Sequence, residues 1–409
     1  MVNYDQKLLK VSLQTSHIMS EKVVLAFSGG LDTSISVSWL MKKHNLDVIT
    51  ATIDVGQDED FDAIEKKSYA IGASKHYTID AKNEFINDYI FPAIKSNALY
   101  QNKYPLATAL GRPLIAYKLV EVANKEDTKI FSHGCTGKGN DQARFDVTLR
   151  SVLSDAKIIA PVREENMSRD EEIQYAKDLN VSIEKKSQYS IDENLWGRSI
   201  EGGILEDSYE EPPKDIYKWI DTESNLSSKY VEIDFNNGIP VSIDGITDSL
   251  QMINHLNDVA GQHGIGVVDH IEDRLMGIKS REIYEAPAAF TIIEAHKDLE
   301  KLVLTRNELE MKSILEQKWS WMIYSGLFVD PLVQAIDSFI NKTQERVNGT
   351  VRLKLKNGSL VVVGRKSKNS IYDQNLSSYS SSSDFDQTFS KGFIEIWGLQ
   401  SKFNEGDKQ

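Results

Sequence analysis

Residues 26–34 read Ala26-Phe27-Ser28-Gly29-Gly30-Leu31-Asp32-Thr33-Ser34, and they follow an apolar run that is typical of a buried strand. In open α/β sheets, ligands bind at strand ends, where loops leave the backbone accessible. Gly29 and Gly30 can adopt positive φ, so their N–H groups can approach an anion, and the start of a helix attracts phosphate. The hydroxyls of Ser28, Thr33 and Ser34 add donors. The string therefore predicts a phosphate-binding loop rather than an ordinary glycine-rich turn.

The pattern around this loop predicts a doubly wound α/β domain. Between residues 22 and 185, short apolar runs alternate with segments in which apolar residues recur every three or four positions. Such alternation is typical of parallel strands joined by helices. The predicted strands are Val23–Phe27, Asp47–Asp54, Lys75–Ile79, Lys129–His133 and Lys157–Ala160, and the predicted helices are 33–44, 59–71, 83–96, 113–125 and 141–153. A further helix is expected from about residue 169, with Ser168 and Glu171 in capping-box spacing.

The second half has the pattern of an α+β domain. Alternating apolar and polar residues flank Asn237-Gly238 and Asn357-Gly358, which predicts two β-hairpins with tight turns. Helices are predicted at 246–262, 298–316 and 331–347, and the serine-rich stretch Ser377–Ser383 is predicted to be an exposed loop. We therefore expect an N-terminal extension at 1–20, a nucleotide-binding α/β domain at 21–185, an α+β domain at 186–375 and a C-terminal tail at 376–409.

Composition limits the classes of function. The net charge of −14 disfavours general nucleic-acid binding, because an acidic surface repels phosphate backbones. No apolar run approaches the roughly 20 residues that span a bilayer, and residues 1–20 lack signal-peptide features, so a cytoplasmic location is expected. The single cysteine, Cys135, excludes an intramolecular disulfide. The histidines lack metal-ligand spacing, so no protein-bound metal is expected. His263 and His270 flank a predicted turn-to-strand region and are interpreted as structural.

A second glycine-rich string follows a later predicted strand. It reads Ser132-His133-Gly134-Cys135-Thr136-Gly137-Lys138-Gly139-Asn140-Asp141-Gln142-Ala143-Arg144-Phe145. The density of glycines and polar groups at a strand end favours ligand binding over a plain connector. The string does not complete a Walker pattern, since Gly139 follows Lys138 where Ser or Thr belongs.

The first string resembles the pyrophosphate loop of the N-type ATP pyrophosphatases, which implies that ATP is cut into AMP and pyrophosphate. Both strings, with three further ones, resemble the argininosuccinate synthase family; the three are Tyr104–Pro113, Ser190–Asp207 and Glu272–Pro287. The strings occur in the family's order, from about residue 22 to near the end of the chain. The resemblance implies ATP-dependent ligation of citrulline and aspartate through citrullyl-AMP, as in arginine biosynthesis. It also implies Mg²⁺ brought by ATP, a synthetase domain at 186–375, and a homotetramer.

Residue roles follow from the same resemblance. ATP contacts are implied for Ala26, Phe27, Ser28, Gly29, Gly30, Leu31, Asp32, Thr33 and Ser34, for Ile53 beside the adenine, and for Gly134, Gly137, Lys138 and Gly139. Aspartate contacts are implied for Thr136, Asn140 and Asp141. Citrulline contacts are implied for Tyr104, Asn140, Arg144, Ser190, Ser199, Glu272 and Tyr284, with Thr108 as a candidate. We expect catalysis to depend on Asp32, Asp141 and Arg144. The tail, with Trp397 and Phe403, is implied to be an oligomerisation arm.

Some positions depart from the family pattern and leave alternatives open. Ala109 stands where many members have a serine, so Thr108 is expected to replace its hydrogen bond or the bond is lost. Glu282 stands where a small residue is usual. One alternative is a degenerate homologue that binds ATP without turnover. Another is a different adenylating pyrophosphate-loop ligase; a tRNA enzyme of that group should carry a basic patch or catalytic cysteines, which the net charge and the single cysteine disfavour.

Overall fold

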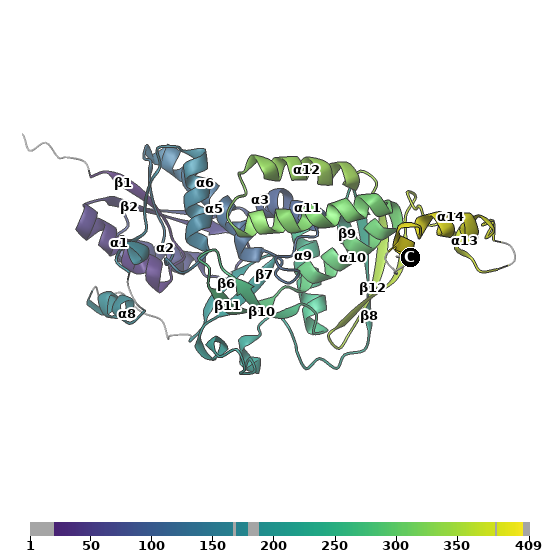
Figure 1. Cartoon of the computed structure of the whole chain (residues 1–409). Coiled ribbons are helices and arrows are strands. Elements are labelled where there is room, and N and C mark those ends of the chain that lie inside the picture. Colours follow the sequence, from purple (N-terminus) through teal and green to yellow (C-terminus); the bar gives the residue numbers. More distant parts are fainter. Residues whose placement is uncertain (1–19, 167–168, 179–187, 381–382, 404–409) are drawn as a thin grey trace, which may run out of the picture.

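The structure is a computed structural model that describes residues 20–166, 169–178, 188–380 and 383–403. The expected extension at 1–20 lies outside the described residues except for Ser20, and so do Ser168 of the expected capping box and the expected boundary near residue 185. An α/β half, a second half with antiparallel sheets and helices, and a C-terminal segment follow one another along the molecule (Figure 1).

The N-terminal half is built on the predicted parallel sheet. Its strands lie in the order β3-β2-β1-β4-β5, with bounds β1 Lys22–Ala26, β2 Asp47–Asp54, β3 Lys75–Asp80, β4 Ile130–Ser132 and β5 Lys157–Ile159. The strand order reverses beside β1, where Leu25 pairs with Thr50 of β2 on one side and with Ser132 of β4 on the other. Ligands of open α/β sheets bind at such a reversal, at the carboxyl ends of the strands.

The helices of this half follow the predicted segments with three differences. They are α1 (Leu31–His44), α2 (Phe61–Ala70), α5 (Ala107–Glu126), α6 (Asp141–Val152), α7 (Pro161–Glu164) and α8 (Arg169–Asp178). The first difference is the short helix α7, which was not predicted. The segment predicted as one helix at 83–96 is divided into α3 (Lys82–Phe85), a π-helical turn η1 (Ile86–Ile90) and α4 (Phe91–Lys95). Pro92 has no N–H for a helical bond, which favours such a widened turn. Helix α5 begins well before residue 113, and Pro113 lies inside it.

The second half contains two antiparallel sheets. The predicted hairpins are confirmed as β8 (Lys229–Asn236) with β9 (Ile239–Ile243), and β12 (Gly349–Lys356) with β13 (Ser359–Lys366), joined in one sheet. Positive φ at both turn residues of each hairpin explains the Asn-Gly pairs. The other sheet has the order β10-β11-β7-β6, with bounds β6 Ser190–Asn194, β7 Gly197–Glu201, β10 Val267–Asp273 and β11 Lys279–Glu285. The sequence indicated only a strand near His270 in this sheet.

The long helices described beside these sheets are α9 (Ser249–Gln262), α10 (Pro287–Val303), α11 (Arg306–Tyr324) and α12 (Pro331–Gln344). The prediction of one helix at 298–316 is wrong, because the chain leaves helical geometry at Leu304. Thr305 then caps a new helix, accepting from the Glu308 N–H while the Glu308 carboxylate accepts from the Thr305 N–H. The Thr305-x-x-Glu308 spacing was a readable signal for this helix start.

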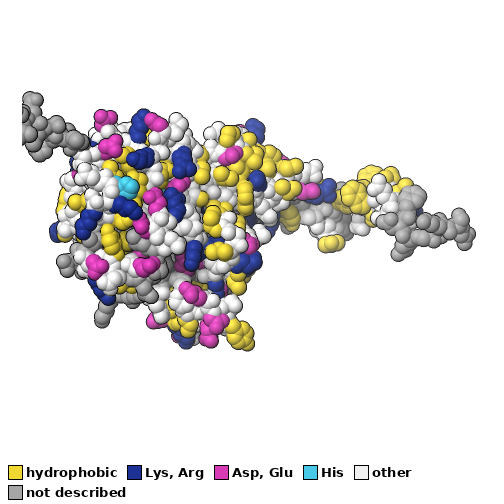
Figure 2. Space-filling model, turned by 60° about the vertical axis from the view of Figure 1, so that its left-hand side comes forward, with side chains coloured by type: hydrophobic (Ala, Val, Ile, Leu, Met, Phe, Trp, Pro, Cys, Tyr) yellow, Lys and Arg dark blue, Asp and Glu magenta, His cyan; other side chains and the backbone are white. Residues whose placement is uncertain are grey.

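The C-terminal segment projects from the body (Figure 1). It carries α13 (Gln374–Ser377) and α14 (Phe389–Trp397), and α14 buries none of its side chains. Figure 2 shows hydrophobic side chains gathered on this projection. The predicted exposed loop Ser377–Ser383 is exposed at Ser377, Tyr379 and Ser380 and half-buried at Ser378 and Ser383. Ser377 ends α13, and residues 381–382 lie outside the described residues.

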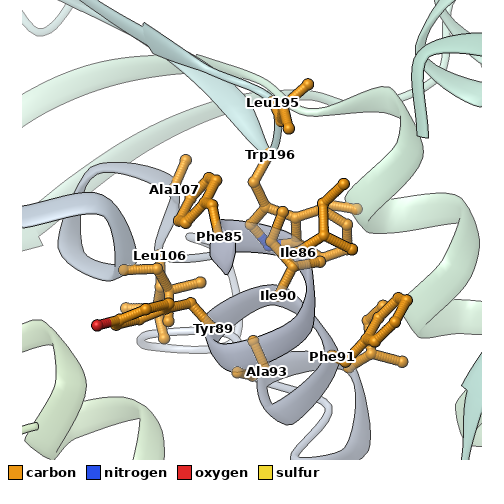
Figure 3. Packing of buried hydrophobic residues seen from close by; sticks show 14 of the residues in the cluster. Phe85, Ile86, Tyr89, Ile90, Phe91, Ala93, Leu106, Ala107, Leu195 and Trp196 are labelled. Atoms are coloured by element: carbon orange, nitrogen blue, oxygen red, sulfur yellow. The ribbon is translucent and has the colours of Figure 1, made fainter. Parts of the chain in front are cut away.

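A continuous core joins the two halves, and Figure 3 shows the part of it around Trp196. Side chains of α3, η1 and α4, including Phe85 and Ile90, pack around Trp196, which lies in the turn between β6 and β7. The Trp196 indole N–H donates to the Pro105 carbonyl at 3.0 Å, just before α5. The sheet that carries the family strings is thereby fixed against the nucleotide-binding half.

Candidate active site

The first loop presents the uncapped start of a helix at the end of β1. Gly30 is the N-cap residue of α1, and no side chain caps it. The Gly30 N–H donates to Ser28 Oγ at 3.3 Å, and the Thr33 hydroxyl donates to the Gly30 carbonyl at 3.3 Å. Gly29 has a φ of +74°, a conformation that a residue with a Cβ rarely adopts. N–H groups at such a helix start, with the helix dipole, attract phosphate oxygens.

The second loop lies against the first. A Cβ on Gly134 would lie 3.1 Å from Thr33 Cγ2 and 3.2 Å from Asp32 Cβ, so the two loops are in contact and a side chain here would require the first loop to shift. The Gln142 amide donates to the carbonyls of Gly137 at 2.6 Å and Gly139 at 3.2 Å, which closes the loop on itself. The two glycine-rich strings, far apart in sequence, therefore form one site at the strand-order reversal.

Helix α6 begins directly after the second loop and carries a charge pair of the half-buried Asp141 and the buried Arg144. Asp141 accepts from Arg112 Nε and from Arg144 Nη1, both at 2.7 Å. Burial alone would raise the pKa of Asp141, but the two guanidinium groups hold it below its usual range. Arg112 also donates to Asp192 of β6 at 2.8 Å, which ties α5 to the second half. Arg112 was not among the predicted site residues, although it lies inside a quoted family string.

A cluster of carboxylates and tyrosines adjoins this pair. Glu272 is 1% exposed and accepts from the hydroxyls of Tyr284 and Tyr324, each at 2.5 Å. Asn140 donates to the Tyr324 hydroxyl at 2.8 Å, which connects the cluster to the start of α6. Burial raises the pKa of Glu272 to about 7, and the charge of Glu282 adds to the shift.

Glu282, Arg274 and Glu201 complete the cluster. Glu282 Oε2 lies 2.9 Å from the Tyr284 hydroxyl, and its other oxygen accepts from Arg274 at 3.1 Å. Arg274 also pairs with Glu201. Burial, together with the charge of Glu282, raises the pKa of Glu201 to about 7. The sequence gave no role to Arg274, Glu201 or Tyr324, and Tyr324 lies at the end of α11 without a local motif.

The remaining predicted residues surround these groups. The Tyr104 ring stacks on Tyr284 with centroids 4.2 Å apart, and its hydroxyl accepts from the Thr108 N–H at 2.9 Å. Ser199 pairs with Tyr284 across β7 and β11, whereas Ser190 pairs with Glu201 at the exposed start of β6. The other residues lie at the loops or their strands: Thr136 and Lys138 are exposed on the second loop, and Ile53 is buried near the end of β2.

Arg144 lies deeper than a freely accessible ligand-binding residue. Its Nε and Nη2 donate to the Tyr324 carbonyl at 3.1 and 3.0 Å, and the residue is 4% exposed. Its remaining Nη1 bond goes to Asp141. The predicted grip on a substrate carboxylate therefore requires Arg144 to exchange or share at least one of these partners.

Comparisons with known proteins decide the family. Two family models, the arginosuccinate synthase N-terminal HUP domain and C-terminal domain, match residues 22–182 and 189–404. The chain belongs to the argininosuccinate synthase family. The argininosuccinate synthase of Pyrococcus furiosus is 53% identical over 383 residues, which cover 93% of each chain. Those of Dictyoglomus thermophilum and Listeria monocytogenes are 54% and 50% identical, covering 93% and 94% of this chain and 96% of each relative.

Membership of the argininosuccinate synthase family confirms the resemblance that was predicted from five strings. Among the described residues, no group of three or more His, Cys, Asp or Glu side chains could hold a metal ion. In the same part of the chain, no helix combines the length and apolar character needed to cross a membrane.

Proposed function

We propose that this protein catalyses the argininosuccinate synthase reaction, in which ATP, citrulline and aspartate give argininosuccinate, AMP and pyrophosphate. Family membership gives the reaction class, and one observation of geometry carries the proposal. The Gly134 loop lies against the phosphate loop at Thr33, and Asn140, which precedes α6 at the end of the Gly134 loop, donates to Tyr324 of the Glu272 cluster. One nucleotide and two amino acids can therefore meet at the strand-order reversal.

The chemistry needs positioning more than a protein nucleophile. The citrulline ureido oxygen attacks the α-phosphorus, the bond to the bridging oxygen breaks, and pyrophosphate leaves with the electron pair. The aspartate amine, in its neutral form, then attacks the ureido carbon of citrullyl-AMP and expels AMP, and the new C–N nitrogen releases a proton to solvent. Adenylation is required because a ureido carbon is a poor electrophile. Donors and glycines at strand ends are the groups suited to hold the charge that moves onto the phosphates.

Citrulline is assigned to the tyrosine and carboxylate cluster. Ionised Glu272 suits the α-ammonium group, and Arg144 suits the α-carboxylate because its fork can bind two oxygens. The supporting observation is proximity, since Asn140 links the Tyr324 hydroxyl on Glu272 to the start of α6. Six further residues are proposed to line the citrulline site: Tyr104, Thr108, Asn140, Ser190, Ser199 and Tyr284.

Aspartate is assigned to the start of α6, with Thr136, Asn140 and Asp141. The lowered pKa of Asp141 makes it a weak base. Its proposed role is therefore to pair with the substrate ammonium, while Arg112 supplies positive charge near the aspartate carboxylates.

ATP is assigned to the two loops, with Ile53 beside the adenine. Asp32 is the acidic residue in the first turn of α1, and Mg²⁺ prefers carboxylate and phosphate oxygens. These donors fit a metal ion that arrives with ATP, and Asp32 is proposed to help hold it. The magnesium ion would neutralise phosphate charge when it is bound.

A homotetramer, with α14 as an oligomer contact, is the proposed assembly. The side chains of Phe389, Ile396 and Trp397 on α14 are 72–76% exposed, an unusual state for large apolar groups. Removal of residues 388–409 should lower the mass measured by light scattering, and an unchanged tetramer would exclude this role for α14. The structure does not describe the side chain of Phe403, the other apolar residue of the predicted oligomerisation arm. A cytoplasmic location and domain boundaries near residues 20, 185 and 375 remain predictions from the sequence.

The function is tested by product analysis. Purified protein with MgATP should form AMP and pyrophosphate only when citrulline is present, and argininosuccinate only when aspartate is added. Asp32→Ala and Arg144→Ala variants serve as controls for the assigned site. Binding of ATP without turnover at saturating citrulline and aspartate would support the degenerate homologue instead, and formation of ADP would exclude the proposed chemistry.

A further inference from the structure

Helix α2 packs directly beneath the phosphate loop. A Cβ on Gly29 would lie 3.2 Å from Ile64 Cγ1, so the loop and the helix are in contact. Residues three apart lie on the same face of a helix, which brings Lys67 to the same place as Ile64. The Lys67 ammonium group donates to the Gly29 carbonyl, in the middle of the loop. This contact places a positive charge at the loop that is assigned to the phosphates.

The charge of Lys67 is not matched by an anion of the protein. Among the residues that the structure describes, no carboxylate lies within 4.0 Å of its ammonium group, whereas Lys75 and Lys82, later in the same half of the chain, are paired with Glu126 and Asp54. Lys67 is half-buried, and within the described part of the chain its side chain makes one hydrogen bond, to the neutral Gly29 carbonyl. A partly desolvated cation with only a neutral partner is costly. A phosphate ligand in the adjoining loop would supply the missing negative charge.

We propose that Lys67 is a catalytic residue that binds the pyrophosphate as it leaves the α-phosphorus; this rests on the proposed function. When the bond to the α-phosphorus breaks, the electron pair goes to the bridging oxygen and negative charge accumulates on the pyrophosphate. Lys67 stays protonated throughout and transfers no proton. An ammonium group has three donors, so one can remain on the Gly29 carbonyl while the others reach phosphate oxygens. The interaction strengthens as charge develops, which is the condition for lowering a barrier.

A purely structural role for Lys67 makes a different prediction. If the side chain only held the Gly29 carbonyl, its loss would be buffered, because the Ser34 hydroxyl also donates to that carbonyl at 3.3 Å. Collapse of the loop would weaken the binding of every nucleotide that uses the site, including AMP, which has no β or γ phosphate. The loss of a charge that faces the pyrophosphate would weaken pyrophosphate binding and leave AMP binding unchanged.

The test compares Lys67→Met, Lys67→Arg and the matched control Lys66→Met, which alters the exposed neighbour on the same helix. Titration calorimetry, without ATP, measures the binding of inorganic pyrophosphate with Mg²⁺ and, separately, of AMP. We expect Lys67→Met to weaken pyrophosphate binding by about tenfold or more and to lower kcat by on the order of 10²-fold, with AMP binding unchanged. Lys67→Arg should restore part of both losses, and Lys66→Met should stay within about twofold of the wild type.

Three outcomes would overturn the proposal: pyrophosphate binding by Lys67→Met that equals the wild type, parallel losses of AMP and pyrophosphate binding, or a kcat that does not change. Thermal unfolding of each variant shows whether it is folded. Failure of the proposed function would look different, because the wild-type protein itself would then form no AMP in response to citrulline.

Discussion

Replacing Glu282 with glutamine should move the acidic limit of citrulline use to lower pH. The reason is a shortage of protons in the pocket. The Tyr284 hydroxyl carries one proton, yet it lies 2.5 Å from Glu272 and 2.9 Å from Glu282. If it donates to one carboxylate, the contact with the other is favourable only when that carboxyl is protonated. The pair is therefore most stable when it holds one additional proton.

The magnitude follows from the pKa of Glu272, which burial and then the Glu282 charge raise to about 7. As the pH falls through this value, Glu272 gains a proton and loses the charge that attracts the citrulline ammonium group. About nine tenths of the group is ionised one unit above the pKa and about one tenth one unit below it. The kcat/KM for citrulline should therefore fall roughly tenfold between pH 8 and pH 6. In Glu282→Gln the neighbouring charge is gone, so the pKa of Glu272 falls. A larger fraction of the maximal kcat/KM for citrulline therefore remains at pH 6.

The assay is the rate of AMP formation at limiting citrulline, from pH 5.5 to pH 9, with ATP and aspartate saturating. Because kcat/KM reports the pKa values of the free enzyme, the profile measures the ionisation of the carboxylate cluster before citrulline binds. Glu310→Gln, an exposed carboxylate on α11, is the matched control and should leave the profile unchanged. Glu201 is the second carboxyl with a raised pKa, and it pairs with Arg274. The Glu201→Gln variant shows how much of the acidic limb comes from this group rather than from Glu272. An acidic limb in Glu282→Gln at the wild-type position, or at higher pH, would refute the reasoning.

Three further substitutions test other parts of the structure. Gly134→Val places a branched side chain against Thr33, so we expect kcat/KM for ATP to fall on the order of 10²-fold with little change in the melting temperature; a wild-type rate would show that the loops can separate freely. Arg112→Lys keeps the charge but loses the fork that joins two carboxylates, and steady-state kinetics should show a KM for aspartate raised about tenfold while the KM for ATP stays constant. Lys312→Met leaves the buried Glu300 without its 2.9 Å partner, and denaturant unfolding should show a loss of about 3–5 kcal/mol; an unchanged midpoint would contradict this.

The parallel sheet was predictable because its chemistry is local and simple. The middle strands β1 and β2 are buried on both faces and mostly apolar, and each is followed by a helix pattern. The two glycine-rich loops could also be predicted from the sequence, since each lies at the end of such a strand. Their contact at Gly134 was not readable, because it depends on β4 lying beside β1.

Most of the β10-β11-β7-β6 sheet was not predicted, because its strands carry the charged residues of the candidate site. Glu272, Arg274 and Glu282 take positions in or beside its strands that would otherwise alternate apolar and polar residues. Function there replaces the period-two pattern on which strand prediction depends. Tyr324 and Lys67 escaped for another reason: each is a single residue on a helix, and only tertiary packing brings it to the site.

The most direct test of the account follows one oxygen atom. Citrulline labelled with ¹⁸O in its ureido group is turned over with ATP and aspartate, and the products are analysed by mass spectrometry. If the ureido oxygen attacks the α-phosphorus held between the two loops, the label must leave with AMP, one ¹⁸O for each argininosuccinate formed. Label in orthophosphate together with ADP, or unlabelled AMP, would contradict the central claim.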